Sequence, residues 1–311
     1  MNGMVIAAPQ AWDEACFSVP AVRALMASGL PVTIVCPETQ ETFWETLPGL
    51  SIIHYPPKTS VRGIAEVLEG SEAAVVWENG IAAEACARAR ILRRTGPSGD
   101  KALMKLLTDP LPLPAPGPIE HRVRHYLSVP EALGIDTRVP AFFEPVDLGI
   151  PPVPGTVLLA PDSDYGRSHE WPLERWEKVA RALIERGKRP TIVAVPNGGG
   201  LAAKLLAALG DDARFAELEP LGEALPILAA HEKILAADGS LPHLASHAGS
   251  TCVVLFGPNE PIWKRPLGKR HTILRRHVEC SPCFAAKCVM DLRCQHELTV
   301  EIVLAASLLS I

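Results

Sequence analysis

Short apolar runs rich in β-branched residues alternate with amphipathic stretches along the chain. Strands of a parallel sheet are covered on both faces, so they read as continuous apolar runs. The alternation therefore predicts βαβ units and a doubly wound α/β fold. We expect strands at residues 4–8, 32–36, 51–54, 73–77, 157–160, 191–195, 233–237 and 251–256, and helices at residues 19–28, 40–46, 60–69, 121–133, 173–186, 201–209, 221–230, 241–248 and after Thr299.

The chain has 311 residues, which at roughly 150 residues per domain predicts two domains. Segment 140–154 is rich in proline without a period, so it is the expected linker. We predict one Rossmann-like domain at residues 1–149 and another at 150–311, facing a central ligand cleft, with the last helix a candidate to pack back on the first domain. Residues 110–118, also proline-rich, are expected to form an extended surface loop.

The charge balance and hydropathy exclude several classes of protein. A net charge of -5 and a pI near 6.1 argue against a protein that wraps along nucleic acid. No apolar run reaches the roughly 18 to 20 residues of a spanning helix. The apolar start runs into Asp13 and Glu14 without a preceding basic region, so we expect no signal peptide and a cytoplasmic location. Dinucleotide-binding and P-loop glycine motifs are absent from the sequence.

Asp13 lies between the first expected strand and the first expected helix. Its carboxylate would then lie at the sheet edge that binds ligands, where it could act as a general base on a hydroxyl group. The alternative is that Asp13 caps the helix. Position alone leaves both interpretations open.

Two polar turns follow expected strands in the second half. Residues 162–164 read Asp-Ser-Asp, a pattern some enzymes use to hold a metal, but a solvated turn is the favoured interpretation and we predict no metal there. Residues 238–240 read Asp-Gly-Ser and open a helix whose amides could hold a diphosphate. His243, one turn further, is either a ligand contact or a packed histidine.

Five strings, in this order, resemble the motifs of glycosyltransferase family 9, the ADP-heptose:lipopolysaccharide heptosyltransferases. Asp13 with Pro-Ala-x-Arg-Ala-Leu at 20–25 is similar to the opening motif, although Trp12 replaces the family's glycine. Residues 121–134 resemble H-x-x-x-x-Y-L-x-x-x-x-A-L-G, and residues 161–172 resemble P-G-A-E-[FY]-G-x-A-K-R-W-P. Residues 238–245 and 256–261 resemble D-[ST]-G-x-x-H-x-A and F-G-P-[TS]-[DN]-P, and the C-S-P-C at 280–283 also fits.

The resemblance implies a GT-B fold with an N-terminal acceptor domain and a C-terminal donor domain. It implies inverting, metal-independent transfer of heptose or a related sugar from ADP-heptose to a lipopolysaccharide inner-core acceptor, with Asp13 as the base and no cofactor. The implied partners are a nucleotide sugar and a lipid-linked core oligosaccharide, with peripheral contact at the inner face of the inner membrane and no nucleic acid. The expected donor-binding residues are Ser163, Asp164, His169, Asp238, Gly239, Ser240, Leu241 and His243.

Three donor positions depart from the family pattern. His169 replaces a lysine, Glu170 occupies the neighbouring basic position, and glycines 198–200 occupy the loop where the family carries a glutamate. Diphosphate attraction should be weaker, because histidine is only partly charged at neutral pH. Either the donor differs, or Arg167 and Lys264 compensate, or the chain is a divergent relative that binds a sugar nucleotide or glycan without turnover.

Basic residues cluster between positions 88 and 105. We expect Arg88, Arg93 and Arg94 to contact acceptor phosphates or an anionic membrane surface. The alternative is a solvated face without a ligand.

The eight cysteines form two groups. Cys16, Cys36, Cys86 and Cys252 are scattered and expected to be buried thiols. Cys280, Cys283, Cys288 and Cys294 form C-x₂-C-x₄-C-x₅-C, a candidate structural zinc site. The favoured alternative is reduced thiols packing a loop, or a disulfide on oxidation.

Overall fold

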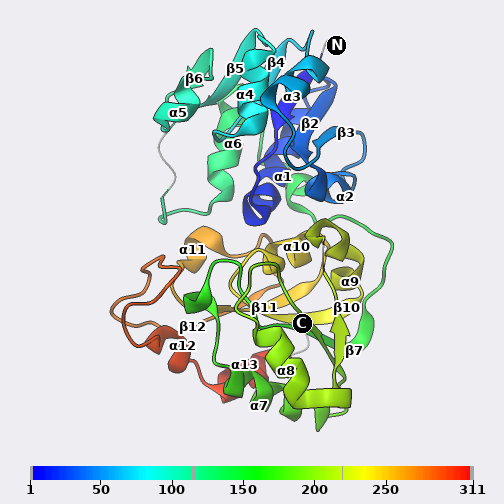
Figure 1. The fold of residues 1–311 in the computed structure, drawn as a ribbon, viewed down its shortest axis with the longest axis vertical. Coiled ribbons are helices and arrows are strands. Elements are labelled where there is room, and N and C mark those ends of the chain that lie inside the picture. Colours follow the sequence, from blue (N-terminus) through cyan, green and yellow to red (C-terminus); the bar gives the residue numbers. More distant parts are fainter. Residues whose placement is uncertain (1–2, 114–116, 219, 309–311) are drawn as a thin grey trace. The chain divides into compact units, whose positions relative to one another are not determined.

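The computed structural model describes residues 3–113, 117–218 and 220–308, and the chain divides into two compact units at residues 1–144 and 145–311. The division lies inside the proline-rich segment 140–154, five residues before the expected boundary. In each unit the described residues form a parallel sheet of six strands flanked by helices (Figure 1). The predicted doubly wound α/β architecture is confirmed.

The first unit has the strand order β3-β2-β1-β4-β5-β6. Its elements are β1 (Met4–Ala7), α1 (Trp12–Met26), β2 (Val32–Pro37), the 3-10 turn η1 (Glu38–Gln40), α2 (Glu41–Trp44), β3 (Ser51–Tyr55), α3 (Val61–Val67), β4 (Ala73–Val76), α4 (Ile81–Arg88), β5 (Arg93–Pro97), α5 (Lys101–Met104), β6 (Asp109–Leu111), α6 (Val123–Ala132) and η2 (Pro140–Phe143).

The second unit has the strand order β12-β11-β10-β7-β8-β9. Its elements are β7 (Val153–Ala160), η3 (Arg167–His169), α7 (Leu173–Ile184), β8 (Pro190–Val193), α8 (Leu201–Leu209), η4 (Gly210–Asp212), β9 (Arg214–Ala216), η5 (Leu221–Ala224), α9 (Leu225–Ala229), β10 (His231–Ala237), α10 (Leu241–His247), β11 (Thr251–Phe256), α11 (Pro261–Lys264), β12 (Thr272–Arg275), α12 (Arg293–His296) and α13 (Val300–Leu308).

The inner strands are the ones the sequence identifies. β1 reads MVIA and is buried along its whole length, as expected for a strand covered on both faces. The strands missed by the sequence analysis are β5 and β6 in the first unit and β9 and β12 in the second. Each is short or carries polar or proline residues, because the outer strands of a sheet need less apolar surface.

Helix α1 begins earlier than predicted. It starts at Trp12 rather than near residue 19, and Pro20 lies in its interior. Asp13 and Glu14 occupy its first turn, where acidic side chains are favourable next to the helix dipole. Asp13 is therefore part of the helix, not a residue that precedes it.

Each unit has its own apolar core. In the second unit the paired rings of Trp171 and Trp176, 5.7 Å apart between centroids, are fully buried under the sheet's flanking helices. The last described helix, α13, packs against α7 and β11 of its own unit. Of the expected loop at 110–118, residues 110 and 111 belong to edge strand β6 and residues 114–116 lie outside the described residues.

The helices in the described part of the chain are too short or too polar to cross a membrane. The four scattered cysteines are buried, as predicted.

Candidate functional site

The residues expected to bind a donor meet at the carboxyl edge of the second sheet. Strands β7 and β10 are parallel neighbours, with Ala160 opposite Ala236. The loops that follow them, residues 161–172 and 238–240, are therefore adjacent, at the edge where open α/β sheets bind ligands.

A buried carboxylate organises this edge. Asp238 is 1% exposed, and its Oδ2 accepts hydrogen bonds from His169 Nδ1 (3.0 Å) and Asn259 Nδ2 (2.8 Å). Burial raises the pKa of the Asp238 carboxyl, and the hydrogen bond from His169 leads the contacts that oppose this rise. Asp238 thereby fixes the His169 ring through Nδ1 and leaves Nε2 for a further partner.

Side-chain hydrogen bonds tie the two loops together. The Ser163 hydroxyl donates to the Asp238 carbonyl (2.5 Å) and accepts from the Tyr165 amide (3.1 Å). The Ser240 amide donates to Asp164 Oδ1 (2.8 Å). The expected donor residues of both loops thus form one connected cluster.

The start of α10 offers fewer amides to a phosphate than the sequence predicts. The Ser240 amide is bonded to Asp164, Pro242 has no N–H, and the His243 amide donates to the Ser240 carbonyl (3.1 Å). In the described turn this leaves the amides of Gly239 and Leu241. The His243 side chain is 3% exposed, as expected for a packed histidine.

Glycine is required at position 239, between the two loops. A Cβ atom there would lie 2.7 Å from Asp164 Oδ1. Any larger residue would push the loops apart.

The carboxylates of the Asp-Ser-Asp turn point to different partners. Asp162 accepts from the amides of Leu201 (2.6 Å) and Ala202 (3.3 Å) at the start of α8, whereas Asp164 faces Ser240. The two carboxylates of this turn therefore accept hydrogen bonds from backbone amides of two different helix starts.

Glu170 accepts a hydrogen bond from the glycine-rich loop that follows β8. Its Oε1 accepts from the amides of Gly199 (2.7 Å) and Ser163 (3.1 Å), and the residue is 9% exposed. A Cβ at Gly199 would lie 2.2 Å from Glu170 Oε2. Glu170 therefore connects the loops that follow β7 and β8. Its close approach explains why the β8 loop has glycine at position 199, and its two amide donors explain why position 170 is acidic rather than basic.

Lys264 brings a positive charge to this edge. It ends the short helix α11, and its Nζ lies 4.8 Å from the ring centroid of Tyr165 and 5.6 Å from that of Trp263. Its charge reaches Asp238, whose pKa it helps to lower. Cation–π contacts of this kind hold a lysine side chain in place. The sequence named Lys264 as a compensating residue but could not place it.

In the first unit, Asp13 is buried (3% exposed) in the opening turn of α1 at the carboxyl edge of the sheet. The N-cap of α1 is Ala11, so the alternative that Asp13 caps this helix is wrong. The charge of Asp13 affects both Glu78 and Arg122. Burial raises the pKa of the Glu78 carboxyl, which places a second, weaker acid beside Asp13.

The sequence analysis missed a buried ion pair beside Asp13. Arg122 Nε donates to Glu14 Oε2 (2.8 Å), and the Tyr126 hydroxyl donates to the same oxygen (2.5 Å). Both partners come from the segment 121–134, the second of the family-like strings. The signal was present in that string, but sequence alone does not show that α6 packs on α1.

The three arginines expected to bind the acceptor are placed elsewhere. Arg93 and Arg94 open β5, and Arg88 ends α4, so all three lie at the amino edge of the parallel sheet, opposite Asp13. Arg94 Nε donates to the Leu106 carbonyl (2.6 Å). This position does not suit contact with an acceptor that reacts at Asp13.

The four clustered cysteines differ in exposure. Cys280 and Cys283 are exposed, Cys288 is half-buried and Cys294 is buried. Burial, followed by the nearby Cys280, Cys283 and Cys288, raises the pKa of Cys294 to about 11. Across residues 3–113, 117–218 and 220–308, no three His, Cys, Asp or Glu side chains are arranged to hold a metal ion, so the zinc candidate is not supported.

Sequence comparison finds relatives in one family. The family model for glycosyltransferase family 9 (heptosyltransferase) matches residues 151–293. Lipooligosaccharide heptosyltransferase 2 of Haemophilus influenzae is 25% identical over 158 residues, 49% of this chain and 45% of that protein. Thus the match spans less than half of that relative's length.

Structural comparison extends the likeness over both units. Heptosyltransferase II of Escherichia coli has a TM-score of 0.76 at 18% identity, covering 98% of this chain and 97% of that chain. The Escherichia coli heptosyltransferase WaaC with ADP has a TM-score of 0.73 at 14% identity, covering 96% and 97%. At such identities the likeness establishes a shared fold.

Proposed function

We propose that this chain, whose residues 151–293 match the model of glycosyltransferase family 9, transfers a sugar from an ADP-linked donor to a lipopolysaccharide core acceptor. Heptose or a related sugar is the group moved. The observation that carries the proposal is the cluster at the carboxyl edge of the second sheet, where Asp238, His169 and Lys264 lie together.

In the proposed reaction Asp13 takes the proton from the acceptor hydroxyl as that oxygen attacks the anomeric carbon. The bond from the anomeric carbon to the diphosphate breaks, and the configuration at that carbon inverts. The nucleoside diphosphate leaves with the bonding electron pair. Glu78 and the Glu14–Arg122 pair surround Asp13 and set its electrostatic environment.

The diphosphate gains negative charge as it leaves. A positive group that is already held in position stabilises this charge without having to reorganise during the reaction. Lys264 supplies a full charge at the donor edge, and His169 is oriented by Asp238 to present Nε2. Since α10 retains few amides for this purpose, we assign the main electrostatic role to Lys264 rather than to the helix. No metal is needed in this scheme.

Asp13→Asn tests the assignment of the base. We expect turnover to fall by roughly 10²- to 10⁴-fold, the usual contribution of a general base, while the ADP dissociation constant stays unchanged. Transfer of radiolabelled heptose and calorimetric titration with ADP measure the two quantities. Glu84→Gln, an exposed residue of α4, is the matched control and should affect neither.

The competing function is binding without turnover, which the replacement of a basic residue by Glu170 favours. A wild-type protein that binds ADP but transfers no sugar to any core acceptor would establish that function. Full turnover by Asp13→Asn would instead remove Asp13 from the mechanism.

A further inference from the structure

A cavity of about 500 Å³ opens at the amino edge of the second sheet, the edge opposite the donor cluster. It is bordered by Thr156, early in β7, by residues 231–233 at the start of β10, and by Thr251, the first residue of β11. Its volume lies within the range of roughly 300 to 1,000 Å³ typical of small-molecule sites.

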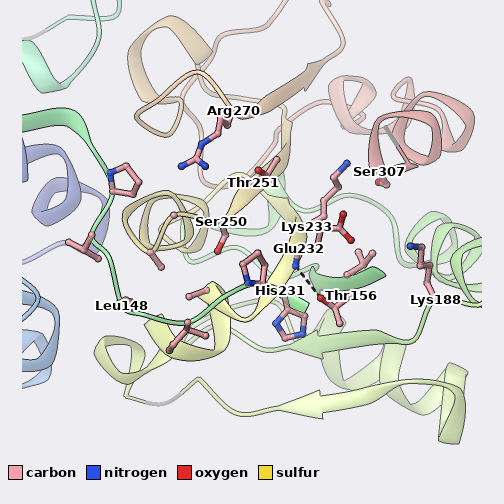
Figure 2. Close-up of a pocket in the computed structure, with 18 of the residues that line it drawn as sticks. Leu148, Thr156, Lys188, His231, Glu232, Lys233, Ser250, Thr251, Arg270 and Ser307 are labelled. Carbon is pink, nitrogen blue, oxygen red and sulfur yellow. Dashed lines mark hydrogen bonds between the residues drawn. The ribbon is translucent and has the colours of Figure 1, made fainter. Parts of the chain in front are cut away.

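Three cations line this cavity, and each comes from a different part of the unit. Lys188 lies between α7 and β8, Lys233 lies in β10, and Arg270 precedes β12. Figure 2 shows Arg270 and Lys188 on opposite sides of the drawn residues, with Lys233 between them. The Lys233 residue as a whole is 8% exposed, because most of its length is covered within β10.

The acidic side chains of the wall are engaged by the backbone. Asp147 Oδ1 accepts from the Gly149 amide (2.8 Å), and Glu232 accepts from the Gly155 amide. His231 uses both ring nitrogens, one on the Ile227 carbonyl (2.7 Å) and one on Thr191 Oγ1 (2.9 Å). These groups hold the wall in place and do not neutralise the cavity fully.

Two of the three cations are less well matched. The side chains of Arg270 and Lys188 form no hydrogen bond or ion pair with any residue that the structure describes. Burial lowers the pKa of Lys233; the nearby Glu232 carboxylate opposes this effect, and the charge of Lys188 adds to it. Like charges gathered around one cavity are stabilised by a bound anion.

We propose that this cavity binds a small phosphate monoester. Arg270 presents a planar guanidinium, which suits bidentate contact with phosphate oxygens, and Lys188 and Lys233 add point charges. The Thr251 hydroxyl, which also lines the cavity, adds a donor. Apolar residues such as Val146 and Leu148 line the other wall and would contact the organic part of the ligand.

The same wall connects the site to the chain segment that joins the two units. Residues 145–152 follow the division after residue 144 and border the cavity. Backbone hydrogen bonds hold this segment at its ends, from the Val146 amide to the His247 carbonyl and from the Val153 amide to the Ala230 carbonyl (both 2.9 Å). A bound phosphate monoester therefore contacts the segment between these two anchors.

Calorimetric titration of the full chain with glycerol 3-phosphate and with inorganic phosphate, at constant ionic strength and in saturating ADP, tests the proposal. We expect one saturable site, with glycerol 3-phosphate the tighter ligand. Arg270→Gln and Lys188→Gln should each weaken binding at least tenfold, whereas the neighbouring exposed Lys269→Gln should not. Both cavity variants alter side chains without partners, so the fold should survive.

The donor edge supplies the internal control. Lys264→Gln should leave glycerol 3-phosphate binding unchanged, because Lys264 lies at the opposite edge of the sheet. Absence of saturable binding, or equal affinity in wild type and both cavity variants, would overturn the proposal. Loss of binding in Lys264→Gln alone would assign the phosphate to the donor edge, and would do so without affecting the proposed transferase function.

Discussion

Lys264 brings to the donor edge a positive charge that the string at 161–172 lacks at residue 169. The family-like string at 161–172 has lost its lysine to His169, which is buried against Asp238. A positive charge reaches the same edge from α11, held over Tyr165. A lysine contributes its charge by position in space, not by position in the motif, so the substitution at residue 169 does not by itself predict a dead site.

Replacing Lys264 by glutamine should weaken ADP binding about tenfold, since hydrogen bonds to charged groups contribute roughly 1.5 to 3 kcal/mol. Tyr165→Leu, which removes the aromatic face, should weaken it less. Calorimetric titration with ADP measures both, with Lys269→Gln as the control for loss of one surface charge. If wild type and Lys264→Gln bind ADP with equal affinity, groups other than Lys264 stabilise the diphosphate.

His125 gives a prediction about pH. Burial, aided by the charge of Arg122, lowers its pKa to about 4 from an ordinary 6.5. Below pH 6.5 the unfolded chain takes up a proton at His125 and the folded chain does not. The free energy of unfolding should therefore fall as pH drops from about 6.5 to about 4, by at most about 1.4 kcal/mol per pH unit from this group.

Urea unfolding of His125→Gln at several pH values between 7.5 and 4.5 checks this. The variant should lose part of the pH dependence seen in the wild type. His277→Gln, which alters an exposed histidine, should keep all of it. Parallel curves for His125→Gln and wild type would contradict the lowered pKa.

At the scale of elements, the donor edge is built from loops that hydrogen-bond to one another. Glu170 joins the β7 loop to the β8 loop, and Asp164 joins the β7 loop to the β10 loop. Glycines at 199 and 239 allow these carboxylates to approach the backbone. The loop geometry therefore depends on small residues and acidic residues together.

Gly199→Ala should destabilise the protein by about 1 to 3 kcal/mol, because its Cβ would lie 2.2 Å from Glu170 Oε2. Adding Glu170→Ala makes room for that Cβ, so the double variant should be more stable than the sum of the single effects predicts. Urea unfolding of all three measures the coupling. Gly63→Ala, in helix α3 with the nearest atom 3.6 Å away, should instead stabilise by about 0.5 to 1 kcal/mol.

At the scale of the whole molecule, each unit has its own sheet and its own core. All residues assigned to the donor edge belong to residues 145–311. A fragment of these residues should therefore fold alone and bind ADP with the affinity of the full chain, but transfer no sugar, because Asp13 is in the other unit. Calorimetry and a transfer assay test both statements, and an unfolded fragment would show that the second unit depends on the first.

The fold class and the positions of the inner strands along the chain could be predicted from the sequence. Their apolar runs follow directly from burial on both faces, which is a local property of the pattern. The sequence also predicted polar turns after β7 and β10, because Ser163 and Asp238 lie just beyond the ends of these strands. Strands β5, β6, β9 and β12 could not be predicted from the sequence, because partly buried strands have a weaker apolar pattern.

The contacts between residues that are far apart in the sequence could not be predicted and are known from the tertiary structure. The pairing of Glu14 with Arg122 spans 108 positions, and that of His169 with Asp238 spans 69. It also placed Arg93 at the edge opposite Asp13, although both are close to strand ends in the sequence. Which edge a residue occupies, and which loops share it, depends on strand order and direction, and these result from packing over the whole sheet rather than from any local string.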